Sequence, residues 1–113
     1  MKGLVYYMNL RQRKKLGKLK EVARFTDFTK GTNWCSGVCG RYQFEAKLFD
    51  EGSCFGINNG RVSKLHIWPK GGYMFAPGTI NYDRGWDIKP NCKNRIVYNA
   101  IMDLLENAPR RFT

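Results

Sequence analysis

Three short segments of this 113-residue chain place a cationic side chain beside a flat ring. Proteins that bind single-stranded nucleic acid use this combination, because Lys and Arg pair with phosphates while aromatic rings stack on bases. Trp68 and Trp86 are the better candidates for exposed rings, although packing in the core is the competing explanation for any one tryptophan. The three segments are Arg41-Tyr42, Lys64-Leu65-His66-Ile67-Trp68-Pro69-Lys70 and Arg84-Gly85-Trp86.

Metal binding is a second chemistry that the residue types allow. Structural zinc sites use two closely spaced ligand pairs, and here only Cys35 and Cys39 form a pair, a loose one. Cys54 and Cys92 stand apart, and His66 is the single histidine. We therefore expect ordinary thiols and no cofactor, with a zinc site built from these residues as the alternative.

Catalysis has weaker support in the sequence. Asp83 and Asp87 flank a turn, and with Glu45 or Asp50 they offer carboxylates to Mg²⁺ as in a nuclease. Asp also hydrogen-bonds turn backbone, which explains the pair without a metal. His66 has no partner identifiable by sequence, and no phosphate-binding loop or nucleophile motif is present. We expect a protein without enzymatic activity, with a metal-dependent nuclease or nucleotide hydrolase as alternatives.

Positive charge is concentrated at the N-terminus. The chain has 20 Lys and Arg against 9 Asp and Glu, and residues 1–30 hold nine of the former and two of the latter. Apolar residues at helical spacing predict a helix over 10–24 that directs its cations outward, toward phosphates or an acidic protein surface. The predicted polyanion-binding residues are Arg11, Arg13, Lys14, Lys15, Lys18, Lys20, Arg24, Lys64, His66, Trp68, Arg84, Arg110 and Arg111.

The spacing of apolar residues, which indicates the elements that position these side chains, changes at residue 40 from a period of 3.6 to a period of 2. Residues 41–48 alternate apolar and polar side chains without error, which predicts a half-buried antiparallel strand. Further strands are expected at 53–57 and 61–68, and residues 73–75 and 79–82 should form one or two more. Residues 34–39 start the first strand or form a separate one. Asn58-Asn59-Gly60 favours a hairpin turn, because Asn and Gly tolerate positive φ.

An amphipathic helix follows and is ended by Pro109. Its apolar stripe is wide enough to cover one face of a sheet. The expected fold class is α+β: a basic N-terminal helix, an antiparallel meander of three to five strands and a C-terminal helix packed on the sheet. Residues 1–30 form the basic segment, and 31–113 a single domain.

Several motifs resemble a family of small domains found in phages and mobile elements of Gram-positive bacteria, which has no assigned function. The resemblance rests on Trp34-Cys35-Ser36-Gly37, on residues 46–53 (AKLFDEGS), on Phe55-Gly56-Ile57, on residues 60–65 (GRVSKL) and on residues 81–87 (NYDRGWD). It implies a phage or mobile-element origin. It transfers no catalytic residue.

No apolar run reaches the roughly 18–20 residues of a membrane span, and the N-terminus makes a poor signal peptide. We therefore expect a protein of the bacterial cytoplasm that does not bind membranes. The leading hypothesis is a small binding module that engages nucleic acid or a host ribonucleoprotein or nuclease, such as an inhibitor of a CRISPR nuclease. The alternatives are a protein-only inhibitor and a sponge or hydrolase of a cyclic nucleotide signal.

Overall fold

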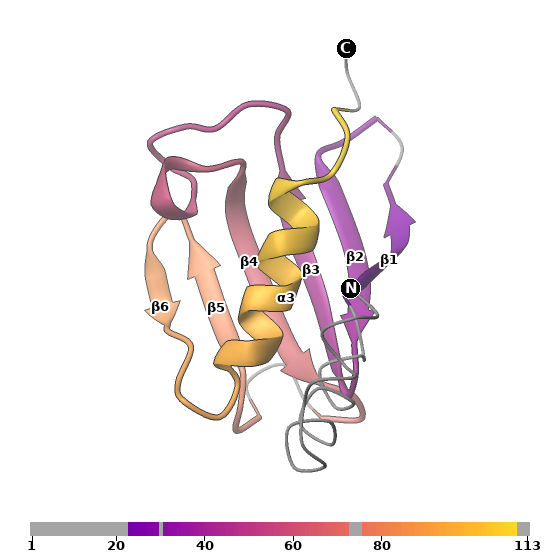
Figure 1. Ribbon diagram of the computed structural model, residues 1–113, viewed down its shortest axis with the longest axis vertical. Coiled ribbons are helices and arrows are strands. Elements are labelled where there is room, and N and C mark those ends of the chain that lie inside the picture. Colours follow the sequence, from indigo (N-terminus) through magenta and orange to yellow (C-terminus); the bar gives the residue numbers. More distant parts are fainter. Residues whose placement is uncertain (1–22, 30, 73–75, 111–113) are drawn as a thin grey trace, which may run out of the picture.

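A single antiparallel sheet of six strands forms the body of the protein (Figure 1). The computed structural model describes residues 23–29, 31–72 and 76–110. Each strand pairs with the next in sequence, so the sheet is a meander without crossovers. Its strands are β1 (Arg24–Phe28), β2 (Trp34–Cys39), β3 (Tyr42–Leu48), β4 (Val62–Pro69), β5 (Ile80–Asp83) and β6 (Trp86–Ile88).

The alternation of side chains separates an apolar face from a polar one. Phe44, Ala46 and Leu48 of β3 are buried, whereas the residues between them are half-buried. In the pairing of β3 with β4, Phe44 lies opposite Ile67 and Ala46 opposite Leu65. Directly opposed residues of an antiparallel pair point to the same face, so these four side chains share the apolar face.

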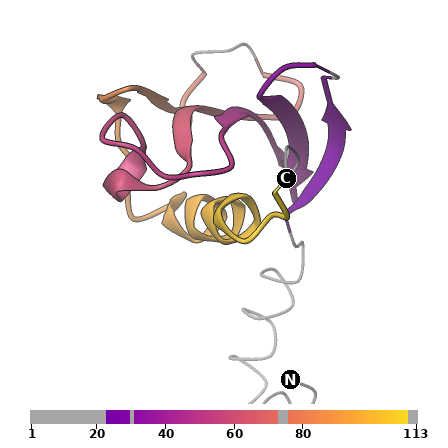
Figure 2. The ribbon, with the colours of Figure 1, turned by 90° about the horizontal axis from the view of Figure 1, so that it is seen from above.

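Helix α3 (Arg95–Glu106) packs against this apolar face (Figure 2). Ile101 and Leu105 are completely buried in the core that the helix forms with the sheet. At the β6 edge of the sheet, the ring of Tyr98 from α3 contacts the ring of Trp86 at a centroid distance of 5.7 Å. The predicted C-terminal helix and its packing on one face are confirmed.

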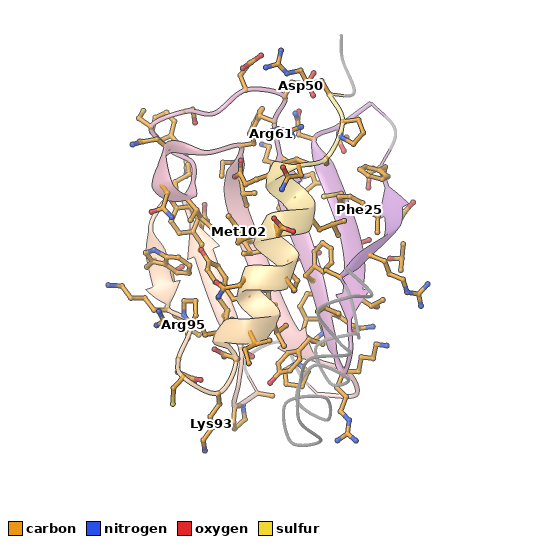
Figure 3. The ribbon with its side chains drawn as sticks, viewed as in Figure 1. Phe25, Asp50, Arg61, Lys93, Arg95 and Met102 are labelled. Atoms are coloured by element: carbon orange, nitrogen blue, oxygen red, sulfur yellow. The ribbon has the colours of Figure 1, made fainter. Side chains whose placement is uncertain are left out.

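The long connection between β3 and β4 is a compact loop, with a 3₁₀ turn, η1 (Ile57–Asn59). Arg61 joins this loop to the C-terminal end of α3, beside which Figure 3 labels it. Its Nε donates a 2.8 Å hydrogen bond to the Phe49 carbonyl, and its Nη1 donates to the carbonyls of Glu106 and Ala108. The Arg61 amide also donates to the Glu106 carboxylate.

Three expectations about the elements are wrong. The sheet has six strands rather than three to five, because β1 and β6 are short edge strands whose period is hard to detect. Residues 53–57 form no strand; there Ser53 and Gly56 make turn hydrogen bonds instead of ladder bonds. Asn58-Asn59-Gly60 is therefore not a hairpin turn, since Asn58 and Asn59 belong to η1 within the loop.

The predicted helix over 10–24 falls mostly outside the described residues, and the strand expected at 73–75 falls outside them entirely. Its last residue, Arg24, begins β1, which pairs with β2. Within the described ranges, no helix is long and apolar enough to cross a membrane.

Candidate functional site

The sheet face opposite α3, here called the polar face, carries three rows of side chains that cross the strands. Antiparallel pairing places them, because opposed residues share a face and lie close together. α3 is the one α-helix of the described part of the chain, and it lies on the other side (Figure 2). The rows are Trp34, Lys47, Lys64 and Asp83; Ser36, Glu45, His66 and Asn81; and Arg24, Val38, Gln43 and Trp68.

His66 and Trp68 stack on this face, with ring centroids 4.7 Å apart and planes tilted by 34°. His66 is buried, and its Nδ1 lies 3.9 Å from the Glu45 carboxylate. Trp68 remains half-exposed. A ligand on the polar face therefore meets Trp68 before His66, and His66 mainly supports the tryptophan ring.

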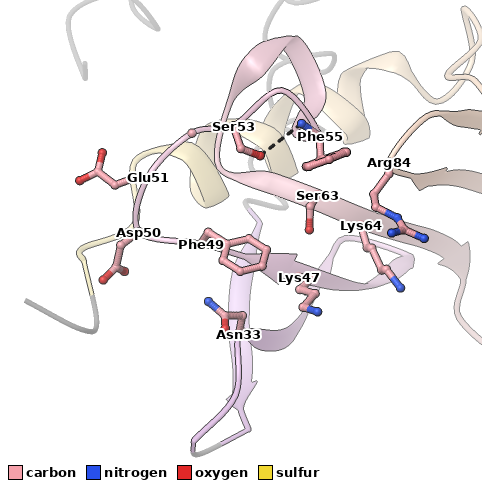
Figure 4. Close-up of a pocket in the computed structure, with 11 residues that line it drawn as sticks. Asn33, Lys47, Phe49, Asp50, Glu51, Ser53, Phe55, Ser63, Lys64 and Arg84 are labelled. Carbon is pink, nitrogen blue, oxygen red and sulfur yellow. Dashed lines mark hydrogen bonds between the residues drawn. The ribbon is translucent and has the colours of Figure 1, made fainter.

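A groove of about 260 Å³ lies over the first two rows, beside a larger pocket of about 680 Å³. We call the larger one the loop pocket (Figure 4). The loop pocket and the groove share Lys64, so the two cavities are neighbours. The loop pocket is lined by Asn33, Lys47, Phe49, Asp50, Glu51, Gly52, Ser53, Phe55, Ser63, Lys64 and Arg84.

Three cations gather at one end of the loop pocket, on the side of the sheet (Figure 4). Lys47 and Lys64 lie directly opposite each other on β3 and β4, an arrangement of like charges that destabilises a sheet. Asp83 offsets part of this charge, since its Oδ1 is 3.7 Å from Lys64 Nζ and 3.5 Å from Arg84 Nε. Lys47 joins no ion pair with any described residue, and its Nζ lies 5.6 Å from the centroid of the Phe49 ring.

Arg84 reaches the loop pocket from a turn in which its own backbone is strained. Its φ is +55°, and of the three non-glycine residues with positive φ in the described ranges the other two are Asn58 and Asn59. Asn visits this left-handed region readily, whereas Arg does not. The Arg84 amide is held by a 2.9 Å hydrogen bond to the Ser63 carbonyl. Such an outlier in a turn is a reason to look for a functional role of the side chain.

Aromatic rings and acids complete the loop pocket. Phe49 and Phe55 are 36% and 57% exposed, a large fraction for phenylalanine. The loop that carries them is fixed, because the Tyr82 hydroxyl donates to the Phe55 carbonyl at 3.0 Å. Asp50 and Glu51 lie beyond Phe49, away from the cations (Figure 4). Glu51 turns to Arg110, whose Nη1 is 2.9 Å from its Oε1.

Residues 33–106 match a family described as a domain of unknown function, DUF7678. The chain belongs to this family. No curated protein and no solved structure matches the chain. The matched range begins at Asn33 in the loop pocket and ends at Glu106, the acceptor for the Arg61 amide. The DUF7678 domain thus contains the whole loop pocket and the groove beside it.

The predicted polyanion-binding residues separate into three groups. Lys64 and Arg84 meet in the loop pocket, and His66 and Trp68 lie on the polar face of the DUF7678 domain. Arg24 is exposed on the edge strand β1, outside the loop pocket. Arg110 pairs with Glu51, a residue that lines the loop pocket. The remaining predictions, Arg11, Arg13, Lys14, Lys15, Lys18, Lys20 and Arg111, lie outside the described residues.

The residues considered for metal binding are dispersed. Cys35 and Cys39 are buried in β2, while Cys54 and Cys92 are exposed in separate loops. Within residues 23–29, 31–72 and 76–110, no three His, Cys, Asp or Glu side chains are grouped so as to hold a metal ion. Asp83, one of the carboxylates considered for Mg²⁺, forms ion pairs with the side chains of Lys64 and Arg84.

Lys47, Phe49 and Phe55 were missed as site residues. The alternation of residues 41–48 already placed Lys47 on the polar side of its strand. What was missing is the register that sets it opposite Lys64. Both phenylalanines belong to the loop between β3 and β4, for which the sequence predicts a strand at 53–57, so the position of Phe55 at the loop pocket is not predictable.

Proposed function

We propose that this DUF7678 protein is a small, non-enzymatic module that binds single-stranded nucleic acid across the polar face. One observation carries the proposal: Lys47 and Lys64 share a row with Trp34, and Trp68 stands two rows away on the same surface. Cations spaced along a sheet suit the phosphates of a strand, and half-exposed rings between them suit its bases. A duplex offers its bases no such access.

The basic N-terminal segment supports the same proposal at longer range. Residues 1–30 hold nine basic and two acidic residues, so they carry seven of the eleven net positive charges of the chain. Charge of this density attracts any polyanion without reading its sequence. The polar face then supplies the contacts that depend on unpaired bases.

The test compares fluorescently labelled single-stranded and duplex oligonucleotides of equal length, with binding measured by anisotropy from low to high salt. Single strands should bind more tightly, and their affinity should fall steeply as salt rises. Lys64→Gln should reduce the slope of log K against log salt by about 0.7, as expected when one contact to a single strand is lost. Trp68→Leu should weaken binding about tenfold or more through lost stacking.

Lys93→Gln is the matched control for the loss of one charge. Lys93 is exposed and lies at the end of the molecule opposite Asp50 (Figure 3). It should change neither the affinity nor the salt slope. Equal binding of duplex and single strand, or equal losses in Lys64→Gln and Lys93→Gln, would show that the polar face is not the binding surface.

We also propose that the natural target is a nucleic-acid-processing complex of a bacterial host, which the protein inhibits on behalf of a phage or mobile element. The resemblance of its motifs to phage and mobile-element domains and the basic segment support this target. An RNA-guided nuclease complex should then bind the protein more tightly than its naked guide RNA does, and lose activity when bound. Tight binding to the complex without any binding to naked nucleic acid would favour the protein-only inhibitor instead.

A further inference from the structure

The loop pocket differs from the rest of the polar face in volume, charge and lining. Its volume is about 680 Å³, the size of sites that take small organic ligands, whereas the adjoining groove measures about 260 Å³. Phe49 and Phe55 stand over it from the loop, and Lys47, Lys64 and Arg84 approach from the sheet and its turn (Figure 4). It thus combines a cationic end with an aromatic wall.

The charge at the cationic end fits a dianion better than a monoanion. At this end Lys47, Lys64 and Arg84 meet the carboxylate of Asp83, which leaves two positive charges in excess locally. The other two carboxylates of the lining, those of Asp50 and Glu51, lie at the opposite end, and Glu51 pairs with Arg110. A phosphodiester inside a strand carries one negative charge. A phosphomonoester carries nearly two at pH 7, because its second pKa is about 6.

The donors at this end also suit a phosphate group. The Arg84 guanidinium offers a planar fork that matches phosphate oxygens, and the two lysines add point charges that adjust to the ligand. Arg84 keeps this position in spite of its unfavourable φ of +55°, although glycine follows it in the same turn. Phe49 and Phe55 then lie where the base or sugar attached to the phosphate can pack.

We infer that the loop pocket binds the phosphomonoester of a nucleotide, presented either by the end of a nucleic-acid strand or by a free nucleoside monophosphate. For a strand end, the inference rests on the proposed function, since the strand must reach the loop pocket along the polar face. Lys64 lines both cavities, so a strand lying on the groove has its end beside Arg84.

The experiment measures binding of four oligonucleotides of one sequence: with a 5′-phosphate, with a 3′-phosphate, with hydroxyls at both ends, and circular. One phosphorylated end should bind at least about tenfold more tightly than the hydroxyl-ended strand, as expected for a charge-assisted pair of hydrogen bonds. Adenosine and cytidine monophosphates are added as competitors. If they displace the phosphorylated oligonucleotide and the nucleosides do not, the loop pocket also accepts free nucleotides.

Arg84→Gly should abolish the preference for the phosphorylated end while leaving hydroxyl-ended and circular strands bound. Lys47→Gln should reduce this preference and also weaken the binding of every strand, because Lys47 belongs to the polar face as well. Lys93→Gln should retain the preference, and thermal unfolding of each variant verifies that it is folded. Equal affinity for phosphorylated and hydroxyl ends, or a preference that survives Arg84→Gly, would overturn the inference and leave the proposed function standing. If no hydroxyl-ended or circular strand binds, the proposed function fails, and displacement of a labelled nucleoside monophosphate then decides the inference by itself.

Discussion

Replacing Arg84 separates what its side chain does from what its backbone costs. A non-glycine residue in the left-handed region costs about 1–2 kcal/mol, and Arg84 sits there with φ +55°. Arg84→Gly removes that strain, whereas Arg84→Ala retains it. Both remove the guanidinium and its pair with Asp83, so this pair cancels in the comparison. Glycine also lowers the free energy of unfolding by about 0.4–1 kcal/mol relative to alanine, because it gives the unfolded chain more conformational freedom.

The expected result is that Arg84→Gly is more stable than Arg84→Ala by about 1 kcal/mol, or about 4 °C in Tm. Urea unfolding followed by tryptophan fluorescence measures the difference directly. Both variants should bind a phosphorylated oligonucleotide equally weakly. If Arg84→Ala is as stable as Arg84→Gly, the turn is not strained, and the argument that Arg84 is kept there for its side chain loses its basis.

Three further predictions concern other contacts of the fold. Arg61→Ala should lower the free energy of unfolding by about 3 kcal/mol, because hydrogen bonds from a charged group are lost, and hydrogen exchange should speed up in residues 49–60. Gly56→Ala should destabilise by about 1–3 kcal/mol in urea unfolding, since a Cβ there overlaps the Gly60 carbonyl oxygen. The pKa of Tyr98 is raised from 10.0, first by burial and then by Glu106 and Tyr82, so the neutral phenol is favoured in the folded state. Its contribution to stability is complete below pH 10 and lost as pH rises through the folded pKa, a loss that Tyr98→Phe should lack when melting temperatures are compared from pH 8 to 11.

Periodicity identified the elements that bury a continuous apolar stripe. The strand at residues 41–48 and the final helix were predictable because every second residue of the former, and every third or fourth of the latter, enters the core. The positive φ of Asn58 and Asn59 was predictable as well, since Asn tolerates it. These two residues do not join two strands, however; they form η1 within the loop. Local preference specified the backbone angle there, and tertiary contacts such as the Arg61 hydrogen bonds specified the path of the chain.

The candidate site was only partly predictable, because it depends on register. Lys64 and Arg84 were singled out from their neighbours in sequence, but Lys47 joins them only through the pairing of β3 with β4. A shift of one residue in that pairing would turn Lys47 to the opposite face. Phe55 depends on the loop in the same way. Chemistry that is assembled from several strands and a loop is therefore visible one residue at a time in the sequence, and as a site only in the fold.

We propose that positive charge serves two different purposes in this chain. The nine basic residues of the first thirty act through their number, so their attraction for a polyanion is long-range, indifferent to sequence and weakened by salt. The three cations of the loop pocket act through position, because the sheet holds two of them opposite each other and a strained turn supplies the third. Like charges held opposite each other on neighbouring strands lower the stability of the fold, and an anion bound between them removes this cost. In this proposal, the net charge of +11 attracts nucleic acid, and the loop pocket recognises its terminal phosphate.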